Sequence, residues 1–337
     1  MMSLLALGMA SALSTATPQM ETIRLPIGPD SADHVALHCL APGSTAARSA
    51  PTPGVLFIHG ASFPTMLAFG FEFAPGDSWM SYMADRGYLA CGLDFLGFGE
   101  SSHPAAMKAA PQGAPPVDRA AEAARQIALA VDYMRRQRGV TRLHLVAHSW
   151  GTIPAAMYAA GSPSTVASLT LFGPVVPKPE KHPEKVDFAW WPLSAQTRYE
   201  QLEFTDVLPP AMHLLEPAVH ARWAGQFAAS APPSSKAPNG DLRIPAGPLA
   251  DLAAAEAGDY PYAQDKVSCP VFVVLGDYDT VVDRAGAAAF LARFVASPLK
   301  WLVQIDHGTH VMHLEKNRHS LYSSVQAFIT AVEGRTP

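Results

Sequence analysis

Short apolar runs alternate with longer amphipathic stretches along most of this chain, and that alternation limits the folds it can adopt. Such runs suit strands buried on both faces, and the stretches between them carry apolar residues at helical spacing. Strands that alternate with helices build a mainly parallel sheet covered by helices. The sequence therefore predicts an α/β protein. Its expected strands lie at 22–28, 35–40, 54–60, 88–95, 142–149, 166–174, 270–277 and 299–305.

The expected helices fill the gaps between these runs. The segment 117–138 has the clearest pattern, with acidic residues near its start and arginines at its end, as the helix dipole favours. The other expected helices are 78–86, 151–160, 284–295 and 316–333. We expect a mostly parallel eight-stranded sheet flanked by helices, with the first two strands forming a hairpin at one edge.

The region 177–262 breaks this alternation. It is rich in proline, alanine and tryptophan, and it is too long for a connecting loop inside a compact domain. We interpret it as an inserted, partly helical cap between the sixth and seventh strands. The segments 21–176 and 263–337 then form the core.

The N-terminal segment 1–20 is apolar and contains no charged residue. It is too short and too rich in serine and threonine to predict a stable membrane insertion. It resembles the apolar region of a signal peptide but lacks the usual positive start, and Met20 is an alternative start. The balance slightly favours a cytoplasmic protein over an exported one.

The composition excludes several classes of function. With 337 residues, 49% of them hydrophobic and 16% charged, the chain is globular. Its formal net charge is −5 and no basic cluster stands out, so we expect no nucleic-acid partner. No zinc-like spacing and no glycine-rich phosphate-binding loop occurs, so we expect neither a metal nor an organic cofactor. The three cysteines, Cys39, Cys91 and Cys269, lie far apart in apolar stretches and are expected to be small buried hydrophobes, not disulfide partners.

Ser149 follows an apolar strand pattern and directly precedes a helical one. A sharp strand-to-helix turn of this kind, a nucleophile elbow, exposes a serine hydroxyl at the edge of a sheet. Here Ala147 replaces the first glycine of the usual G-x-S-x-G pattern, and Gly151 supplies the second. From these residues alone, a serine in an ordinary turn remains an alternative.

Acidic and histidine residues follow the last two expected strands. Asp277 and Asp279 come at the end of the seventh strand, and His307, His310 and His313 follow the eighth. The chain order Ser, Asp, His is the one expected when all three project from strand ends of this architecture. A histidine there can accept the serine proton, and an aspartate can orient the histidine.

Five motifs in this order resemble those of the α/β-hydrolase superfamily, over about residues 22–332. Besides the elbow, the chain carries His59-Gly60, the glycine-containing loop Asp94–Ser101, the acidic loop Gly276–Asp279 and the segment Gly308–Glu315. The resemblance implies an α/β-hydrolase fold with a cap.

The resemblance also implies roles for individual residues. Ser149 would be the nucleophile, His310 the base and Asp279 the acid of a catalytic triad. Backbone N–H groups of Ala61 and Trp150 would form the oxyanion hole. His307 and His313 remain alternatives for the base, and Asp277 for the acid.

Aromatic and apolar residues in two regions are candidates for the substrate pocket. Phe63, Met66 and Phe69 follow the third strand, and Trp190 and Trp191 lie in the expected cap. As a group they suggest a mostly apolar pocket. Each could instead pack in the core.

These observations predict a serine hydrolase that cleaves a carboxylic ester with an apolar acyl or alcohol part. Hydrolysis of an amide, a lactone or a carbon–carbon bond by the same triad remains open, as does a ligand-binding protein without turnover. The expected partner is a moderately apolar small molecule.

Overall fold

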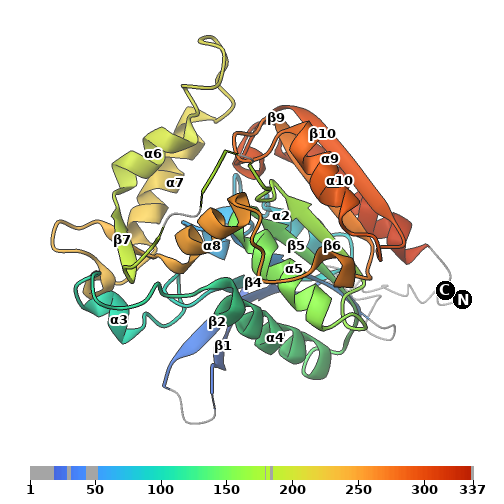
Figure 1. The fold of residues 1–337 in the computed structure, drawn as a ribbon, viewed down its shortest axis with the longest axis horizontal. Coiled ribbons are helices and arrows are strands. Elements are labelled where there is room, and N and C mark those ends of the chain that lie inside the picture. The colour runs from blue at the N-terminus through green and yellow to red at the C-terminus, as the bar shows by residue number, and fades with distance from the viewer. Residues whose placement is uncertain (1–18, 29–31, 43–51, 179, 183–184, 335–337) are drawn as a thin grey trace, which may run out of the picture.

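An eight-stranded sheet forms the centre of the computed structural model, which describes residues 19–28, 32–42, 52–178, 180–182 and 185–334 (Figure 1). The strand order is β1-β2-β4-β3-β5-β6-β9-β10. The pairs β1–β2 and β2–β4 are antiparallel and all other pairs are parallel, which confirms the predicted sheet and its edge hairpin. The strands are β1 (Glu21–Pro26), β2 (His34–Leu40), β3 (Thr52–Ile58), β4 (Leu89–Asp94), β5 (Val140–His148), β6 (Ser168–Phe172), β9 (Val271–Tyr278) and β10 (Lys300–Thr309). Residues 1–18 of the predicted N-terminal segment, 1–20, lie outside the described residues.

Helices cover both faces of this sheet. Right-handed crossovers place α2 (Trp79–Ala84) on one face and α4 (Ala120–Arg136) and α5 (Thr152–Gly161) on the other, because the chain moves in opposite directions along the sheet. The C-terminal helix α10 (Arg318–Glu333) packs beside α2, and α4 lies beside α5 (Figure 1). The other helices of the core are α1 (Thr65–Ala68), α3 (Ala105–Lys108) and α9 (Arg284–Ala292). No helix in the described part of the chain is long and apolar enough to cross a bilayer.

The helix α4 shows how sequence pattern sets these boundaries. Its buried residues include Ala123, Ile127, Ala130 and Met134, whose spacing of three or four residues puts them on one face. Gly139 then adopts a φ of 67°, a left-handed conformation that suits glycine, and the chain turns directly into β5.

The chain leaves the main sheet between β6 and β9. This segment contains an antiparallel pair, β7 (Trp190–Leu193) and β8 (Leu242–Pro245), and the helices α6 (Ala195–Leu202), α7 (Pro217–Ala229) and α8 (Gly247–Glu256). In Figure 1, α6, α7 and β7 stand to one side of the main sheet. Trp223 of α7 donates its indole N–H to the backbone oxygen of Leu67 at 2.8 Å, which joins the segment to the loop after β3. The predicted insertion, 177–262, falls within this segment.

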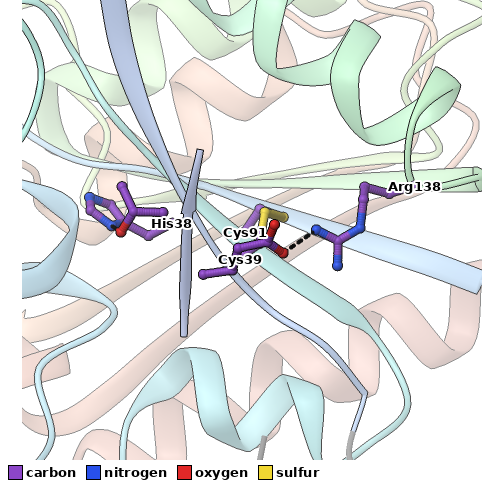
Figure 2. Close-up of a disulfide and its surroundings, with 6 residues drawn as sticks. His38, Cys39, Cys91 and Arg138 are labelled. Atoms are coloured by element: carbon purple, nitrogen blue, oxygen red, sulfur yellow. Dashed lines mark hydrogen bonds and ion pairs between the residues drawn. A yellow bond between two sulfur atoms is a disulfide. The ribbon is translucent and has the colours of Figure 1, made fainter. Parts of the chain in front are cut away.

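A disulfide joins Cys39 of β2 to Cys91 of β4 (Figure 2). The expectation of three free, buried thiols is therefore wrong for these two residues. The two cysteines are 52 residues apart, and they meet because the antiparallel register of β2 and β4 places them directly opposite each other. Only Cys269 is a free thiol among the described cysteines, and burial raises its pKa to about 12.

The carboxyl ends of the parallel strands meet along one edge of the sheet. The residues that follow β3, β5, β9 and β10 are therefore brought together although they are far apart in the sequence. This edge carries the candidate site.

Candidate active site

Ser149 lies in the turn between β5 and α5 with a φ of 56°. This left-handed conformation is unfavourable for a residue with a Cβ, and it persists only where the surroundings enforce it. Gly151 permits the tight turn, because a Cβ on it would lie 2.3 Å from the backbone oxygen of His59. Ala147 is fully buried between its neighbours on β3 and β6, so its methyl group is accommodated in place of a glycine.

A line of hydrogen bonds connects Ser149, His310 and Asp279. The Oγ of Ser149 lies 2.8 Å from Nε2 of His310. The Nδ1 of the same ring lies 3.0 and 3.1 Å from the two carboxylate oxygens of Asp279. Because an ionised carboxylate only accepts, Nδ1 carries the proton and Nε2 is free to accept the serine proton.

Asp279 and Asp277 have different surroundings. The carboxylate of Asp279 is fully enclosed and accepts backbone N–H groups of Val281 and Val282 at 2.8 and 3.3 Å. Asp277 is exposed and accepts the N–H of Gly308 at 3.0 Å. Of the two candidate acids, only Asp279 contacts His310.

Gly173, which follows β6, was not among the residues singled out from the sequence. Its φ is 54°, and a Cβ there would lie 2.8 Å from Nδ1 of His310 and 2.9 Å from Oδ2 of Asp279. A side chain at this position would therefore press on the His310–Asp279 pair. The only sequence signal for it is a glycine directly after a strand.

Neither of the other two candidate histidines is hydrogen-bonded to Ser149 or lines the cleft beside it. His307 is exposed, with a φ of 56°. His313 is buried beside the rings of Phe63, Phe69 and Phe172. Burial lowers the pKa of His313 to about 3, with the neighbouring cationic groups adding to the effect, so it is neutral in the folded protein.

His148 directly precedes the serine and was not predicted to have a role. Its Nε2 donates to the backbone oxygen of His310 at 2.8 Å, and the two rings lie 4.8 Å apart. Burial holds the pKa of His148 well below its ordinary value, and nearby His313 and His310 lower it further. A neutral His148 therefore anchors the loop that carries His310. In the described part of the chain, no group of three or more His, Cys, Asp or Glu residues is arranged to hold a metal ion.

Glu315 supports the same loop from the other side. Its carboxylate accepts both the side-chain hydroxyl and the backbone N–H of Thr309, the residue before His310. Burial raises the pKa of Glu315 to about 7. In the sequence, Glu315 was only the last residue of the segment Gly308–Glu315. Its contacts with Thr309 give it a structural reason to end that motif.

A cleft of about 230 Å³ opens at Ser149. Ala61, predicted to supply an oxyanion-hole amide, lies on its wall, and Gly60 brings that loop against the serine: a Cβ on Gly60 would lie 3.1 Å from Cβ of Ser149. Trp150, the second predicted donor, is fully buried, and its indole N–H donates to Asp251 at 3.0 Å. Larger hollows of about 380, 480 and 530 Å³ lie elsewhere and include none of the three residues of the hydrogen-bonded line.

Two of the five predicted pocket residues, Phe63 and Trp191, line this cleft. The other three do not. Phe69 packs into the core against Phe57 because α1 turns its ring inward. Trp190 lies under the guanidinium of Arg243, 4.6 Å from its carbon, and Met66 borders two of the larger hollows.

The fold, the elbow and the hydrogen-bonded line together define an α/β-hydrolase architecture. Residues 53–317 match the protein family described as the alpha/beta hydrolase fold. This match covers most of the chain, and the protein belongs to that family. A comparison with curated protein sequences gives no match.

Solved structures give the same fold. A serine hydrolase involved in carbazole degradation has a TM-score of 0.60 at 14% identity, and the match covers 93% of this chain and 100% of that one. For a serine hydrolase from the polyaromatic-hydrocarbon-degrading bacterium Cycloclasticus zankles the TM-score is 0.59 at 16% identity, over 94% and 100% of the two chains. The thioesterase domain from the curacin biosynthetic pathway matches with a TM-score of 0.58 at 16% identity, over 91% and 99%. At these identities the likeness is one of fold.

Proposed function

We propose that this protein is a serine hydrolase that cleaves carboxylic esters with an apolar acyl or alcohol part. The observation that carries the proposal is the unbroken line from Ser149 Oγ through His310 to Asp279, which opens into a cleft. Solved structures of similar fold include two described as serine hydrolases and one described as a thioesterase, enzymes in keeping with acyl transfer to water.

The first half of the reaction forms an acyl-enzyme. Ser149 Oγ attacks the ester carbonyl while Nε2 of His310 takes its proton. Asp279 keeps the proton of His310 on Nδ1 and stabilises the imidazolium that forms. His310 then gives its proton to the departing alkoxide, which leaves as the alcohol.

The oxyanion is assigned to the backbone N–H groups of Ala61 and Trp150. Both residues adjoin the reacting hydroxyl, one on the loop after β3 and the other in the elbow itself. Fixed amides that point at the developing charge need no reorganisation during the reaction. In the second half, His310 activates water, which releases the acid and restores Ser149.

The test is hydrolysis of p-nitrophenyl acetate, butyrate and octanoate by the wild type and by Ser149→Ala. Removal of the nucleophile should lower kcat by about 10³- to 10⁶-fold. Ser323→Ala, an exposed serine on α10, is the matched control and should keep the wild-type rate. Activity that survives in Ser149→Ala would overturn the proposal. A wild type that cleaves none of the three esters would turn attention to amides, lactones and carbon–carbon bonds.

A further inference from the structure

Arg198 projects from α6 into the wall of the catalytic cleft. It is the only lysine or arginine among the described residues that line this cleft. Its guanidinium carbon lies 5.3 Å from the centre of the Phe63 ring, another cleft residue. A cation therefore lies in the same small space as the hydroxyl of Ser149.

The guanidinium of Arg198 is poorly satisfied within the protein. One terminal nitrogen donates to the amide oxygen of Gln201 at 3.1 Å. The Nε is shielded from solvent and finds no acceptor among the residues that the structure describes. No carboxylate in the described ranges forms an ion pair with it. Burial alone lowers the pKa of Arg198 to about 10, so it stays cationic at neutral pH.

Trp191 adds a second unpaired donor to the same cleft. Its indole N–H is buried and lacks an acceptor within the described part of the chain. The described lining contains no Asp or Glu side chain that could accept from these two donors. Buried donors without partners are costly, and the cost is removed when a ligand brings the acceptors.

We infer that Arg198 binds a carboxylate of the substrate, so that the preferred substrate is the monoester of a dicarboxylic acid. A guanidinium holds a carboxylate through paired, charge-assisted N–H···O bonds. The cleft of about 230 Å³ is small, so the carboxylate and the ester belong to one compact molecule with a short apolar chain between them. The inference rests on the proposed esterase function and specifies its substrate class.

The experiment compares two pairs of esters that differ only in a terminal carboxylate in place of a methyl group. Mono-p-nitrophenyl adipate is matched with p-nitrophenyl hexanoate, and mono-p-nitrophenyl suberate with p-nitrophenyl octanoate. The measured quantity is the ratio of kcat/KM values within each pair. It is determined for the wild type, Arg198→Met, Arg198→Lys and Arg222→Met. Arg222→Met is the matched control, because Arg222 lies on α7 and is not part of the cleft.

Arg198→Met should lower the ratio of charged to neutral ester by about 10- to 100-fold, since a buried, charge-assisted contact is lost. The neutral esters should change little. Arg198→Lys should restore part of the preference, because it keeps the charge without the fork geometry. Arg222→Met should keep the wild-type ratio.

An unchanged ratio in Arg198→Met would overturn the inference and leave the esterase function standing. An equal loss on both esters would also overturn it, since it would mark Arg198 as a residue that only supports the fold.

A second measurement separates this inference from the proposed function. Adipate binding is measured by calorimetry in Ser149→Ala and in Ser149→Ala/Arg198→Met. Binding that is present in the first and at least tenfold weaker in the second supports the carboxylate site whatever the reaction is. Inorganic phosphate that binds as tightly as adipate would overturn the assignment to a carboxylate.

Discussion

Among the residues that the structure describes, two lines join a hydroxyl, a histidine and an aspartate, and one of them starts at the turn between β5 and α5. In the first, Ser149 Oγ meets His310, which meets Asp279. In the second, the Thr22 hydroxyl lies 3.0 Å from Nδ1 of His38, whose Nε2 lies 2.9 Å from Asp94.

The two lines differ in their backbones and in their other partners. Thr22 lies within the regular edge strand β1, whereas Ser149 is held at a positive φ at the start of a helix. The carboxylate of Asp94 also accepts the backbone N–H groups of Thr65 and Glu100 at 2.8 and 3.1 Å, so it ties two loops to the sheet. His38 directly precedes the disulfide-bonded Cys39 on β2 (Figure 2). Both lines therefore share the same hydrogen-bond geometry, and what sets the first apart is that its hydroxyl lies in a strand-to-helix turn and borders a cleft.

The largest expected effect concerns the histidine of the first line. His310→Asn should lower kcat/KM for p-nitrophenyl hexanoate by about 10³- to 10⁶-fold, because the base is lost. His307→Asn is the control, since asparagine tolerates the left-handed backbone at that exposed position. Comparable losses in both variants would contradict the assignment of the base.

The acid should show the next largest effect. Asp279→Asn should lower kcat by about 10⁴-fold, because an amide can no longer fix the tautomer of His310. The kcat of Asp277→Asn should stay within a few-fold of the wild-type value, since Asp277 accepts the N–H of Gly308 and does not contact His310. Steady-state kinetics on the two variants decides between the carboxylates. A larger loss of kcat in Asp277→Asn than in Asp279→Asn would contradict the assignment of Asp279.

The line Thr22, His38 and Asp94 should affect the free energy of unfolding and leave the rate of hydrolysis unchanged. His38→Gln should lower the free energy of unfolding by about 3–5 kcal/mol, because it leaves Asp94 buried without its partner. Urea unfolding measures this loss, while the folded variant should keep its esterase rate. His319→Gln breaks an exposed pair with Asp77 and should cost less than about 1 kcal/mol.

The pH dependence of that loss follows from two pKa shifts. Burial alone would lower the pKa of His38, but the hydrogen bond and charge of Asp94 raise it overall. The pKa of Asp94 is lowered overall by His38, against the effect of burial.

The stabilisation from His38 is therefore complete below its unfolded pKa of about 6.5 and fades as the pH rises. The stabilisation from Asp94 fades as the pH falls below its unfolded value. The difference between wild type and His38→Gln should be larger at pH 5.5 than at pH 8.5, and an opposite trend would contradict this account.

Loss of the disulfide should have a smaller effect than loss of the His38–Asp94 pair. Replacing both Cys39 and Cys91 by alanine should lower the free energy of unfolding by about 2–4 kcal/mol, with little change in rate. Thiol titration in denaturant checks the bond itself: one thiol, that of Cys269, should react before reduction and all three cysteines after it. Three reactive thiols before reduction would show that the bond is absent.

The sequence predicted most of the fold because the relevant signals are local. The apolar runs and amphipathic stretches gave the eight strands of the main sheet to within a few residues, and 117–138 became α4 with slightly shorter ends. The order Ser, Asp, His at strand ends also predicted the three residues that the structure joins by hydrogen bonds.

What the sequence did not predict depends on contacts between distant segments. His148 and Gly173 acquire their roles from the approach of the loop after β10, which no local pattern reports. The disulfide depends on strand register, and Phe69 turned into the core because a short helix redirected it. The missing acceptor at Nε of Arg198 likewise becomes apparent only when its neighbours are in place.

The positive φ of Ser149 means that backbone stability and the proposed reaction favour different residues at the same position. Glycine would relax the turn and reduce its strain, yet it would remove the hydroxyl that we propose as the nucleophile. Ser149 is thus one of four described non-glycine residues with a positive φ, and it is the one proposed to react. If thermal stability alone were selected, we would expect glycine to replace Ser149. Selection for activity would keep the serine.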